Sequence, residues 1–299
     1  MNCNHECMEL QQMRYAVAVA EERSFTRAAA RCHVVQSALS HQIKALEREL
    51  GLSLFARTSR RVEVTAAGEA FLVSARLSLD AAERAASAAA AATGEIRGTL
   101  TIGVIPTVTA LDIPAVLGAF HRAHPAVGIR LRGGGSDEFI AAIADGSMDV
   151  AVLGLPGAIP HGGVDASVLA RERLVAVVSA QHALAGRREL RLTELAEETF
   201  VDFPVGTTGR APSDLAFAAA GIRREVAFEA MSTDLMLGLV RSNLAIALLS
   251  PAVIPDSGDF RAIPISDGPT RIEYLAWSGF NLSPAAKAFL DGLHGSASA

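Results

Sequence analysis

Cysteine is scarce in this sequence, and its distribution excludes a whole class of folds. The chain has three cysteines in 299 residues, and Cys3, Cys7 and Cys32 all lie in its first tenth. An odd number clustered at one end does not form a disulfide framework, and it fits a reducing compartment, so we predict a cytoplasmic protein. Cys3, His5 and Cys7 could contribute to a metal site. So short a spacing at a chain end more often binds nothing, and we predict no metal.

The motifs of common enzymes are absent as well. The sequence contains no GxSxG elbow, no P-loop, no HExxH pair and no CxxC pair. Four of its eight histidines, His121, His124, His161 and His182, are scattered without metal-ligand spacing. We therefore predict no catalytic residues and no cofactor, and an enzyme remains an alternative to the interpretation below.

Long apolar runs are also missing. The longest nearly uncharged stretch, between Arg97 and Arg122, is interrupted by Asp112 and divided by Pro106 and Pro114. This pattern favours a buried strand followed by a helix over a membrane span. The first 20 residues show no basic start followed by an apolar segment, which argues against export. We expect no membrane contact, and an exported solute-binding protein is the second alternative.

Length and charge suggest two unequal parts. A chain of 299 residues suits a small module joined to a larger one. The net charge is −5, but up to Thr65 there are nine basic and seven acidic residues, against 18 and 25 beyond it. A slightly basic N-terminal module on an acidic body is compatible with a polyanion partner at one end only.

The N-terminal module has the pattern of three short helices. Apolar residues recur at helical spacing over residues 10–22, and Ser24 is suited to cap a second helix that ends near Arg31. A third helix is predicted from residue 36 to Gly51, a C-terminal glycine. Its apolar stripe consists of Leu39, Ile43, Leu46 and Leu50.

Two features after the third helix extend this module. Residues 54–64 read as two short extended arms around a polar basic tip, which predicts a β-wing. Thr65 then opens a long alanine-rich helix to about Ala92. Its apolar face suits dimerisation, and a tether without a partner is the alternative. That face comprises Phe71, Leu72, Ala75, Leu79, Ala82, Ala86 and Ala89.

The third helix carries short donors and cations opposite its apolar stripe. Base edges are read by hydrogen bonds and phosphates by positive charge, so this face is suited to a DNA major groove. An ordinary amphipathic helix with a solvated face is the alternative. Its position, after a short helix and a tight turn and before a basic wing, favours recognition. The residues of this face are Ser37, Ser40, His41, Lys44 and Arg48.

At this point the sequence resembles the LysR-type transcriptional regulators. The resemblance is carried by residues 10–17 (LQQMRYAV), 24–29 (SFTRAA), 36–43 (QSALSHQI), 46–47 (LE), 54–57 (LFAR) and 64–68 (VTAAG), and more weakly by residues 174–182, 192–195, 220–221 and 245–251. It implies that Gln36, Ser37, Ser40 and His41 face bases. It also implies that Thr26, Arg27, Arg57, Thr58, Arg60 and Arg61 position the module on phosphates; we add Lys44 from the helix face.

The sequence departs from the family pattern in two places. Members usually begin near Met8, so residues 1–7 look like an extension or an over-long start. Val35 occupies the position where a Ser or Thr cap of the third helix is expected, which costs about 1 kcal/mol of local stability, and Ser37 compensates only in part. We interpret His41 as a plain polar contact and Cys32 as a small buried hydrophobic residue, because the body of the chain has no cysteine for a peroxide sensor.

Beyond a hinge at residues 94–98, strands alternate with helices. The β-α-β-α-β order over residues 99–155 predicts a parallel sheet with helices on its faces, and the same order restarts at residue 174. Two similar lobes are implied, resembling periplasmic binding proteins, whose ligand lies in the cleft between lobes. Thr107 and Ser136 stand near helix starts, which favours a small carboxylate. The predicted cleft wall is Pro106, Thr107, Val108, Thr109, Gly134, Gly135, Ser136, Phe203, Thr207, Thr208 and Met231.

These observations combine into one prediction. The fold is α/β, with an α-rich winged helix-turn-helix at residues 1–65, a linker helix at 66–93, a hinge at 94–98 and a two-lobed regulatory domain at 99–299. Lobe I covers about residues 99–170 and 266–299, and lobe II about 171–265. The expected partners are double-stranded DNA, an unidentified small-molecule effector and further copies of the chain, as a homodimer or homotetramer formed through the linker helix and regulatory domains. RNA polymerase is a further candidate. We predict a sequence-specific transcriptional regulator whose promoter binding responds to the effector.

Overall fold

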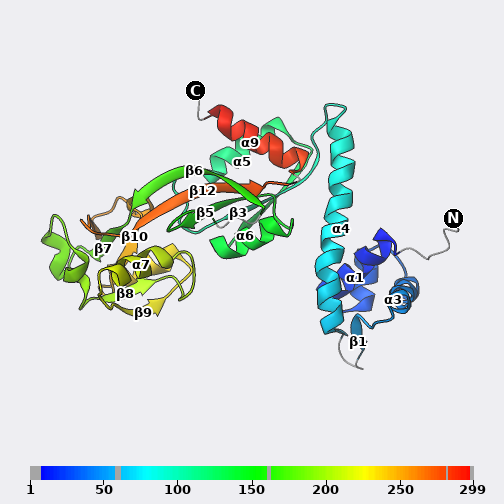
Figure 1. Ribbon diagram of the computed structural model, residues 1–299, viewed down its shortest axis with the longest axis horizontal. Coiled ribbons are helices and arrows are strands. Elements are labelled where there is room, and N and C mark those ends of the chain that lie inside the picture. The colour runs from blue at the N-terminus through cyan, green and yellow to red at the C-terminus, as the bar shows by residue number, and fades with distance from the viewer. Residues whose placement is uncertain (1–7, 58–61, 160–162, 281, 297–299) are drawn as a thin grey trace. The chain divides into compact units, whose positions relative to one another are not determined.

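The computed structural model describes residues 8–57, 62–159, 163–280 and 282–296, and it divides into two compact units at Thr93 and Gly94. Figure 1 labels the helices and strands of both units. No helix within these residue ranges is both long enough and apolar enough to cross a bilayer. Each unit is described by itself below.

The first unit is built from helices with a two-stranded wing. It contains α1 (Leu10–Glu22), α2 (Phe25–Arg31), α3 (Gln36–Leu50), the antiparallel pair β1 (Phe55–Arg57) and β2 (Val62–Val64), and α4 (Ala66–Ala91). Side chains from all four helices form one apolar core, and Leu39, Ile43 and Leu46 of α3 are fully buried in it. The predicted order of helices, wing and long helix is confirmed.

Close packing at the start of α4 explains one glycine of the unit. A Cβ on Gly68 would lie 2.2 Å from the backbone carbonyl oxygen of Leu54, closer than real Cβ contacts allow. Thr65 caps the helix, because its hydroxyl accepts from the N–H of Gly68 at 3.0 Å. Only glycine lets the first turn of α4 approach the segment before the wing so closely.

Part of the apolar face of α4 is used inside this unit. Leu72 belongs to the core that α1 and α3 share, and Ala75, one turn later, is also buried. Further along the same face Leu79 and Ala82 are half-buried, and Ala86 is exposed. The face predicted for a partner helix therefore serves the module itself over its first turns.

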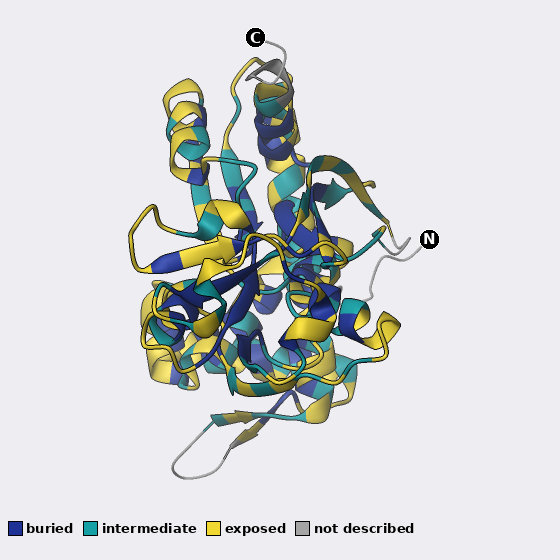
Figure 2. Cartoon of the chain, turned by 90° about the vertical axis from the view of Figure 1, so that its left-hand side faces the viewer, coloured by how far each residue is buried: buried dark blue, intermediate teal, exposed yellow. Residues whose placement is uncertain are grey.

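The second unit contains a five-stranded sheet in lobe I and two smaller sheets in lobe II, and helices pack against them. In lobe I the strand order is β4-β3-β5-β12-β6, with β3 (Gly98–Val104) parallel to β4 (Val127–Gly133) and β5 (Val150–Leu155). Apolar clusters place α5 (Ile113–Ala123) and α9 (Pro284–Ser296) on one face and α6 (Ser136–Ala144) on the other. Figure 2 shows that buried residues concentrate along the central strands.

Lobe II has a different sheet. The three strands β10 (Ala247–Leu249), β7 (Val175–Ser179) and β11 (Phe260–Ile263) are antiparallel. A parallel pair, β8 (Thr199–Asp202) and β9 (Glu225–Glu229), joins them through a bridge between Phe200 and Ile246. The helices α7 (Ala211–Ala219) and α8 (Thr233–Arg241) pack into separate apolar clusters, and three short turns, η1 (Ala183–Gly186), η2 (Leu192–Leu195) and η3 (Pro251–Val253), complete the lobe.

The parallel sheet predicted for residues 99–155 is confirmed by β3, β4 and β5, but the prediction that lobe II repeats this order is wrong, because its three-stranded sheet is antiparallel. Two long strands, β6 (Val164–Arg173) and β12 (Thr270–Ser278), were not predicted, and β12 pairs antiparallel with both β5 and β6. Parallel pairs need a crossover connection, whereas these two strands carry the chain between the lobes without a helix. Charged residues interrupt both strands, so neither has the continuous apolar run on which the prediction relied.

Candidate functional site

The third helix separates its apolar and polar residues onto opposite faces. Leu39, Ile43 and Leu46 are fully buried, while most side chains on the other side of the helix are exposed. Gly51 ends the helix in the left-handed conformation, with φ of 66°. Val35 precedes it with extended backbone and no side-chain hydrogen bond, so the predicted missing cap is confirmed.

The residues predicted to contact DNA mostly lie at the surface of this unit. Five of the predicted residues lie on α3. Of these five, Ser40 is half-buried and the other four are exposed. Arg57 is the last residue of β1, while Thr58, Arg60 and Arg61 lie outside the described residues. The exposed set is Thr26 and Arg27 on α2 with Gln36, Ser37, His41 and Lys44 on α3.

Two contacts that were not predicted from the sequence hold α3 in place. The carboxylate of Glu47 accepts hydrogen bonds from the N–H groups of Leu54 and Phe55, at 2.8 and 3.2 Å, so the start of the wing is anchored to α3. Gln12 on α1 is buried and donates to the side chain of Gln42 at 3.3 Å. Because both contacts join distant segments, nothing local in the sequence indicates them.

The basic residues of α2 are paired within the unit. Arg27 Nε lies 3.3 Å from a carboxylate oxygen of Glu22, and Arg31 lies 2.6 Å from one of Glu21. Both arginine side chains remain more than half exposed. Surface pairs of this kind contribute about 0–1 kcal/mol, so a phosphate can replace the glutamate at little cost.

Cys32 is half-buried at the C-terminal end of α2 and packs against the core of the first unit. The interpretation of this thiol as a small hydrophobic residue fits that position. Burial raises the pKa of the Cys32 thiol, which lowers the thiolate fraction at neutral pH.

The second unit contains a small cavity between its two lobes. Its volume is about 30 Å³, enough for about one water molecule. Residues that follow β3, β4 and β8 form most of the wall. The lining residues are Ile105, Pro106, Thr107, Gly134, Gly135, Ser136, Gly154, Phe203, Thr207, Thr208, Gly209, Met231 and Arg271.

All the predicted cleft residues except Val108 and Thr109 line this cavity. Val108 packs against the apolar clusters of lobe I. Thr109 is bound elsewhere, because its hydroxyl donates to Glu273 at 2.7 Å. The loops that follow the strands were predicted correctly to lie at the cleft. The strand order alone does not show at which residue such a loop turns away from the cleft.

Ser136 is tied to the sheet of lobe I. Its hydroxyl donates to the carbonyl oxygen of Gly154 at 3.2 Å and accepts from the N–H of Gly154 at 3.0 Å. The residue is 2% exposed, so this hydroxyl fixes the start of α6 to β5. The Ser136 hydroxyl is therefore occupied by Gly154, which disfavours the predicted role of Ser136 in binding a carboxylate.

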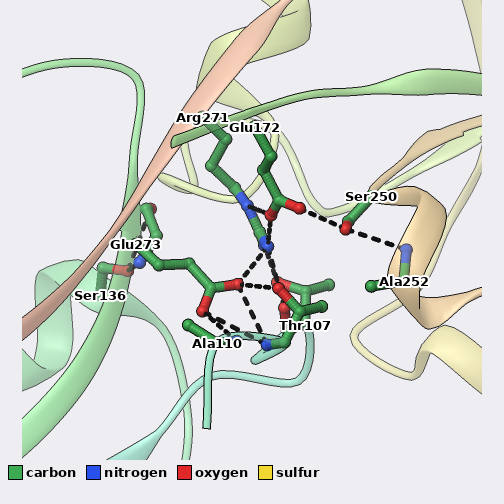
Figure 3. Close-up of polar contacts among 10 residues, drawn as sticks. Thr107, Ala110, Ser136, Glu172, Ser250, Ala252, Arg271 and Glu273 are labelled. Carbon is green, nitrogen blue, oxygen red and sulfur yellow. Dashed lines mark hydrogen bonds and ion pairs between the residues drawn. The ribbon is translucent and has the colours of Figure 1, made fainter. Parts of the chain in front are cut away.

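Arg271 is the charged side chain among the residues that line the cavity, and the sequence interpretation missed it. Figure 3 shows its guanidinium between the carboxylates of Glu172 and Glu273. Nε is 3.0 Å from Glu172, and Nη2 is 2.5 Å from Glu273. On the cavity side the guanidinium also donates to the hydroxyl and, at 2.9 Å, to the carbonyl oxygen of Thr107.

The two carboxylates beside Arg271 have different surroundings. Glu273 is fully buried and accepts from the hydroxyl of Thr109 and from the backbone N–H of Thr109 and Ala110, the latter at 3.0 Å. Glu172 is 16% exposed, and its second oxygen accepts from the hydroxyl of Ser250. Ser250 directly follows β10 and caps η3 of lobe II, so this network connects the two lobes.

A second ionic network holds the lobe II wall of the cavity. Asp202 at the end of β8 pairs with Arg224 at 2.6 Å and accepts from the N–H of Phe203 at 2.7 Å. Arg210 bonds Glu229 at 2.7 Å, and Glu229 accepts from a backbone N–H of the same loop. Burial raises the pKa of Asp202 despite the opposing effect of Arg224. These contacts fix the loop that carries Phe203, Thr207 and Thr208.

In the part of the chain that the structure describes, no three His, Cys, Asp or Glu side chains gather in a way that could hold a metal ion. Cys3, His5 and Cys7 lie outside the described residues.

Comparison with known protein families assigns both units. A family model described as "Bacterial regulatory helix-turn-helix protein, lysR family" matches residues 10–69, and one described as "LysR substrate binding domain" matches residues 93–298. Together they cover most of the chain.

Individual relatives extend over nearly the whole length. The chain is 37% identical to the "Uncharacterized HTH-type transcriptional regulator YnfL" of Escherichia coli, with 94% of this chain and 96% of that protein covered. It is 31% identical to the "RuBisCO operon transcriptional regulator" of Allochromatium vinosum, with 94% of each covered. Among solved structures, full-length CbnR in complex with its target DNA is similar with a TM-score of 0.70 and 27% identity, over 97% of this chain and 100% of that one.

Proposed function

The chain belongs to the LysR family of transcriptional regulators, and on that premise we propose that the exposed face of α3 reads base edges in the major groove of double-stranded DNA. The chain is a DNA-binding regulator with a C-terminal effector-binding domain, not an enzyme. The observation that supports the role of α3 is its segregation into a fully buried apolar stripe and an exposed polar face.

The proposed roles divide the polar residues of the first unit into two groups. Short donors near the start of α3 contact bases, and residues of α2 and the wing contact phosphates, with Lys44 beside them. Phosphate contacts fix the orientation of the module and base contacts supply sequence selectivity. The base group is Gln36, Ser37, Ser40 and His41, and the phosphate group is Thr26, Arg27, Lys44, Arg57, Thr58, Arg60 and Arg61.

The test compares two glutamine substitutions in binding to DNA that flanks the protein's own gene. Gln36→Ala removes an exposed side chain of α3, and Gln181→Ala removes an exposed glutamine of the second unit as a matched control. We call the sequence that the wild type prefers within this DNA the selected site. We expect Gln36→Ala to weaken binding to the selected site by about tenfold or more, since a good base contact contributes about 1–3 kcal/mol. Binding to unrelated DNA should be unchanged. Equal affinities of both variants for the selected site would refute the assignment.

We also propose that the regulator is a homodimer or homotetramer whose copies pair through the later part of α4. The continuing stripe of Leu79, Ala82 and Ala86 supports this, because small side chains let a second helix approach closely. Ala86→Glu on this stripe is expected to lower the oligomeric state in sedimentation experiments. Ala88→Glu, an exposed position off the stripe, is the control. Identical sedimentation of both variants and the wild type would count against this interface.

The effector is proposed to bind in the cavity between the lobes, and to change the DNA-binding mode by favouring one arrangement of the lobes. We propose an interrupted palindrome as the target, read by paired heads whose spacing the lobes control. A cytoplasmic location follows from this function. RNA polymerase is proposed as a further partner at the promoter. DNA footprints that stay identical with every metabolite tried would contradict effector control.

A further inference from the structure

We propose that Arg271 selects the effector, that the effector is a small carboxylate, and that its carboxylate binds by displacing that of Glu172. This inference rests on the proposed function, because it takes the cavity between the lobes as the effector site. It adds a residue, a ligand class and a mode of exchange that the cavity lining alone does not give.

The position of Arg271 makes it the anion-binding group of the cavity. The residue lines the cavity and is 5% exposed, so its guanidinium acts in a poorly hydrated place. Arginine binds carboxylates with two parallel hydrogen bonds, and such charge-assisted bonds are stronger than neutral ones. Glu172 already occupies this edge of the guanidinium, where Nε and Nη2 both donate to its oxygen Oε1 while its Oε2 accepts from Ser250. The fork is therefore preformed for a carboxylate.

The charges require that an incoming carboxylate replaces a resident one. Arg271 with Glu172 and Glu273 sums to one negative charge. A third carboxylate would add like-charge repulsion in a site with little water to screen it. Exchange of one carboxylate for another leaves the charge unchanged.

The surroundings decide which glutamate leaves. Glu273 is fully buried and holds three donors of the Thr109–Ala110 segment besides Arg271. Release of Glu273 would leave those donors unsatisfied. Glu172 is 16% exposed and has the hydroxyl of Ser250 as its other partner. Rotation of the Glu172 side chain toward water therefore costs less, and Glu172 is an internal competitor of the effector.

Displacement of Glu172 would also break a contact with lobe II. The Glu172 carboxylate connects Arg271 of β12 to Ser250, whose hydroxyl accepts from the N–H of Ala252 at 3.3 Å in η3. Thr107 of lobe I is bound to the same guanidinium. When Glu172 leaves, the link between this cluster and η3 is lost, which gives the ligand a different free energy in the two arrangements of the lobes.

The test uses acetate as the probe, titrated calorimetrically into the full chain. Glu172→Ala vacates a space of the size of a carboxylate beside Arg271. We expect this variant to bind acetate at least about tenfold more tightly than the wild type, because the internal competitor is gone. Acetamide, a neutral molecule of the same shape, is expected to show no such gain. Glu189→Ala, at an exposed glutamate of lobe II, is the matched control and should behave as the wild type.

Two further variants keep the result decisive. The double variant Glu172→Ala/Arg271→Gln should lose the gain in acetate affinity, since the fork is removed. If Glu172→Ala does not fold, Glu172→Gln keeps the size of the side chain without its charge, and it should also bind acetate more tightly than the wild type. The proposal is overturned if neither Glu172 variant gains affinity, or if the double variant keeps the gain.

Acetate binding and DNA binding are separate readouts. If the wild type binds DNA selectively but neither Glu172 variant gains acetate affinity, this inference is overturned and the proposed function stands. A gain in acetate affinity without selective DNA binding would support the exchange at Arg271 and count against the proposed function.

Discussion

The two units use arginine–glutamate pairs in opposite ways. In the first unit the side chain of Arg27 is 65% exposed beside Glu22, whereas in the second the side chain of Arg271 is 6% exposed between two carboxylates. An exposed pair is weak, so DNA phosphates can replace the glutamate. A buried guanidinium must always have partners, because an unpaired charge there is costly. On our proposals, the first unit thus exchanges glutamates for phosphates at little cost, whereas the second exchanges only one carboxylate for another.

The largest expected effect comes from removing the buried arginine. Arg271→Leu leaves Glu172 and Glu273 facing each other without a cation, and we expect a loss of about 3–5 kcal/mol from the unfolding free energy of the second unit. Trp277, the single tryptophan, lies on β12 and reports this transition by fluorescence in a urea titration. A loss below 1 kcal/mol would remove the contrast between the units.

The corresponding change in the first unit should hardly affect stability. Arg27→Ala breaks an exposed pair, so we expect the unfolding free energy to fall by less than about 1 kcal/mol. Circular dichroism of the whole chain during unfolding measures this loss. DNA affinity is expected to fall for selected and unselected sequences alike, since a phosphate contact carries no sequence information. A loss confined to the selected site would instead assign Arg27 to base reading.

A third prediction concerns Lys44 and the salt dependence of DNA affinity. Lys44→Gln removes one exposed cation from α3, so the slope of log affinity against log salt concentration should become shallower by about one unit. The measurement is a DNA-binding series at increasing salt, with Lys287→Gln on α9 of the second unit as control. An unchanged slope would place Lys44 away from the phosphates.

The smallest effect concerns Cys32. Burial raises the pKa of its thiol, so less thiolate is present at a given pH and alkylation should be slower. In a Cys3→Ser/Cys7→Ser background, we expect iodoacetamide to modify Cys32 more slowly than it modifies glutathione at pH 8. Mass spectrometry measures the modified fraction of each over time. Modification as fast as that of glutathione would show that Cys32 is more reactive than its position indicates.

The sequence predicts the first unit better than the second, and the reason is the range of the contacts. Helical periodicity, Ser24 and Gly51 are local signals, and they locate α1, α2 and α3 correctly. The pairing of Arg271 with Glu172 joins residues 99 positions apart. In the sequence these two residues only look like charges that interrupt β12 and β6, so both the strands and the central cation of the cavity were missed.

The cleft loops were predictable because ligands in such sheets lie outside the carboxyl ends of the strands. That rule located Thr107, Gly134 and Phe203 correctly at the cavity. It could not show that Thr109 turns back to hold Glu273, or that Ser136 is bound to Gly154. These outcomes depend on packing between segments, which strand order does not specify.

The small volume of the cavity has a kinetic consequence. If the effector binds here, as we propose, a cavity of about 30 Å³ is smaller than the ligand, and the lobes must move apart to admit it. The observed association rate should then level off at high ligand concentration, at the rate of lobe opening. The apparent affinity is also reduced by the fraction of molecules that are open. On the same proposal, a bound effector cannot leave faster than the lobes reopen, and we expect the promoter response to outlast a brief fall in effector concentration.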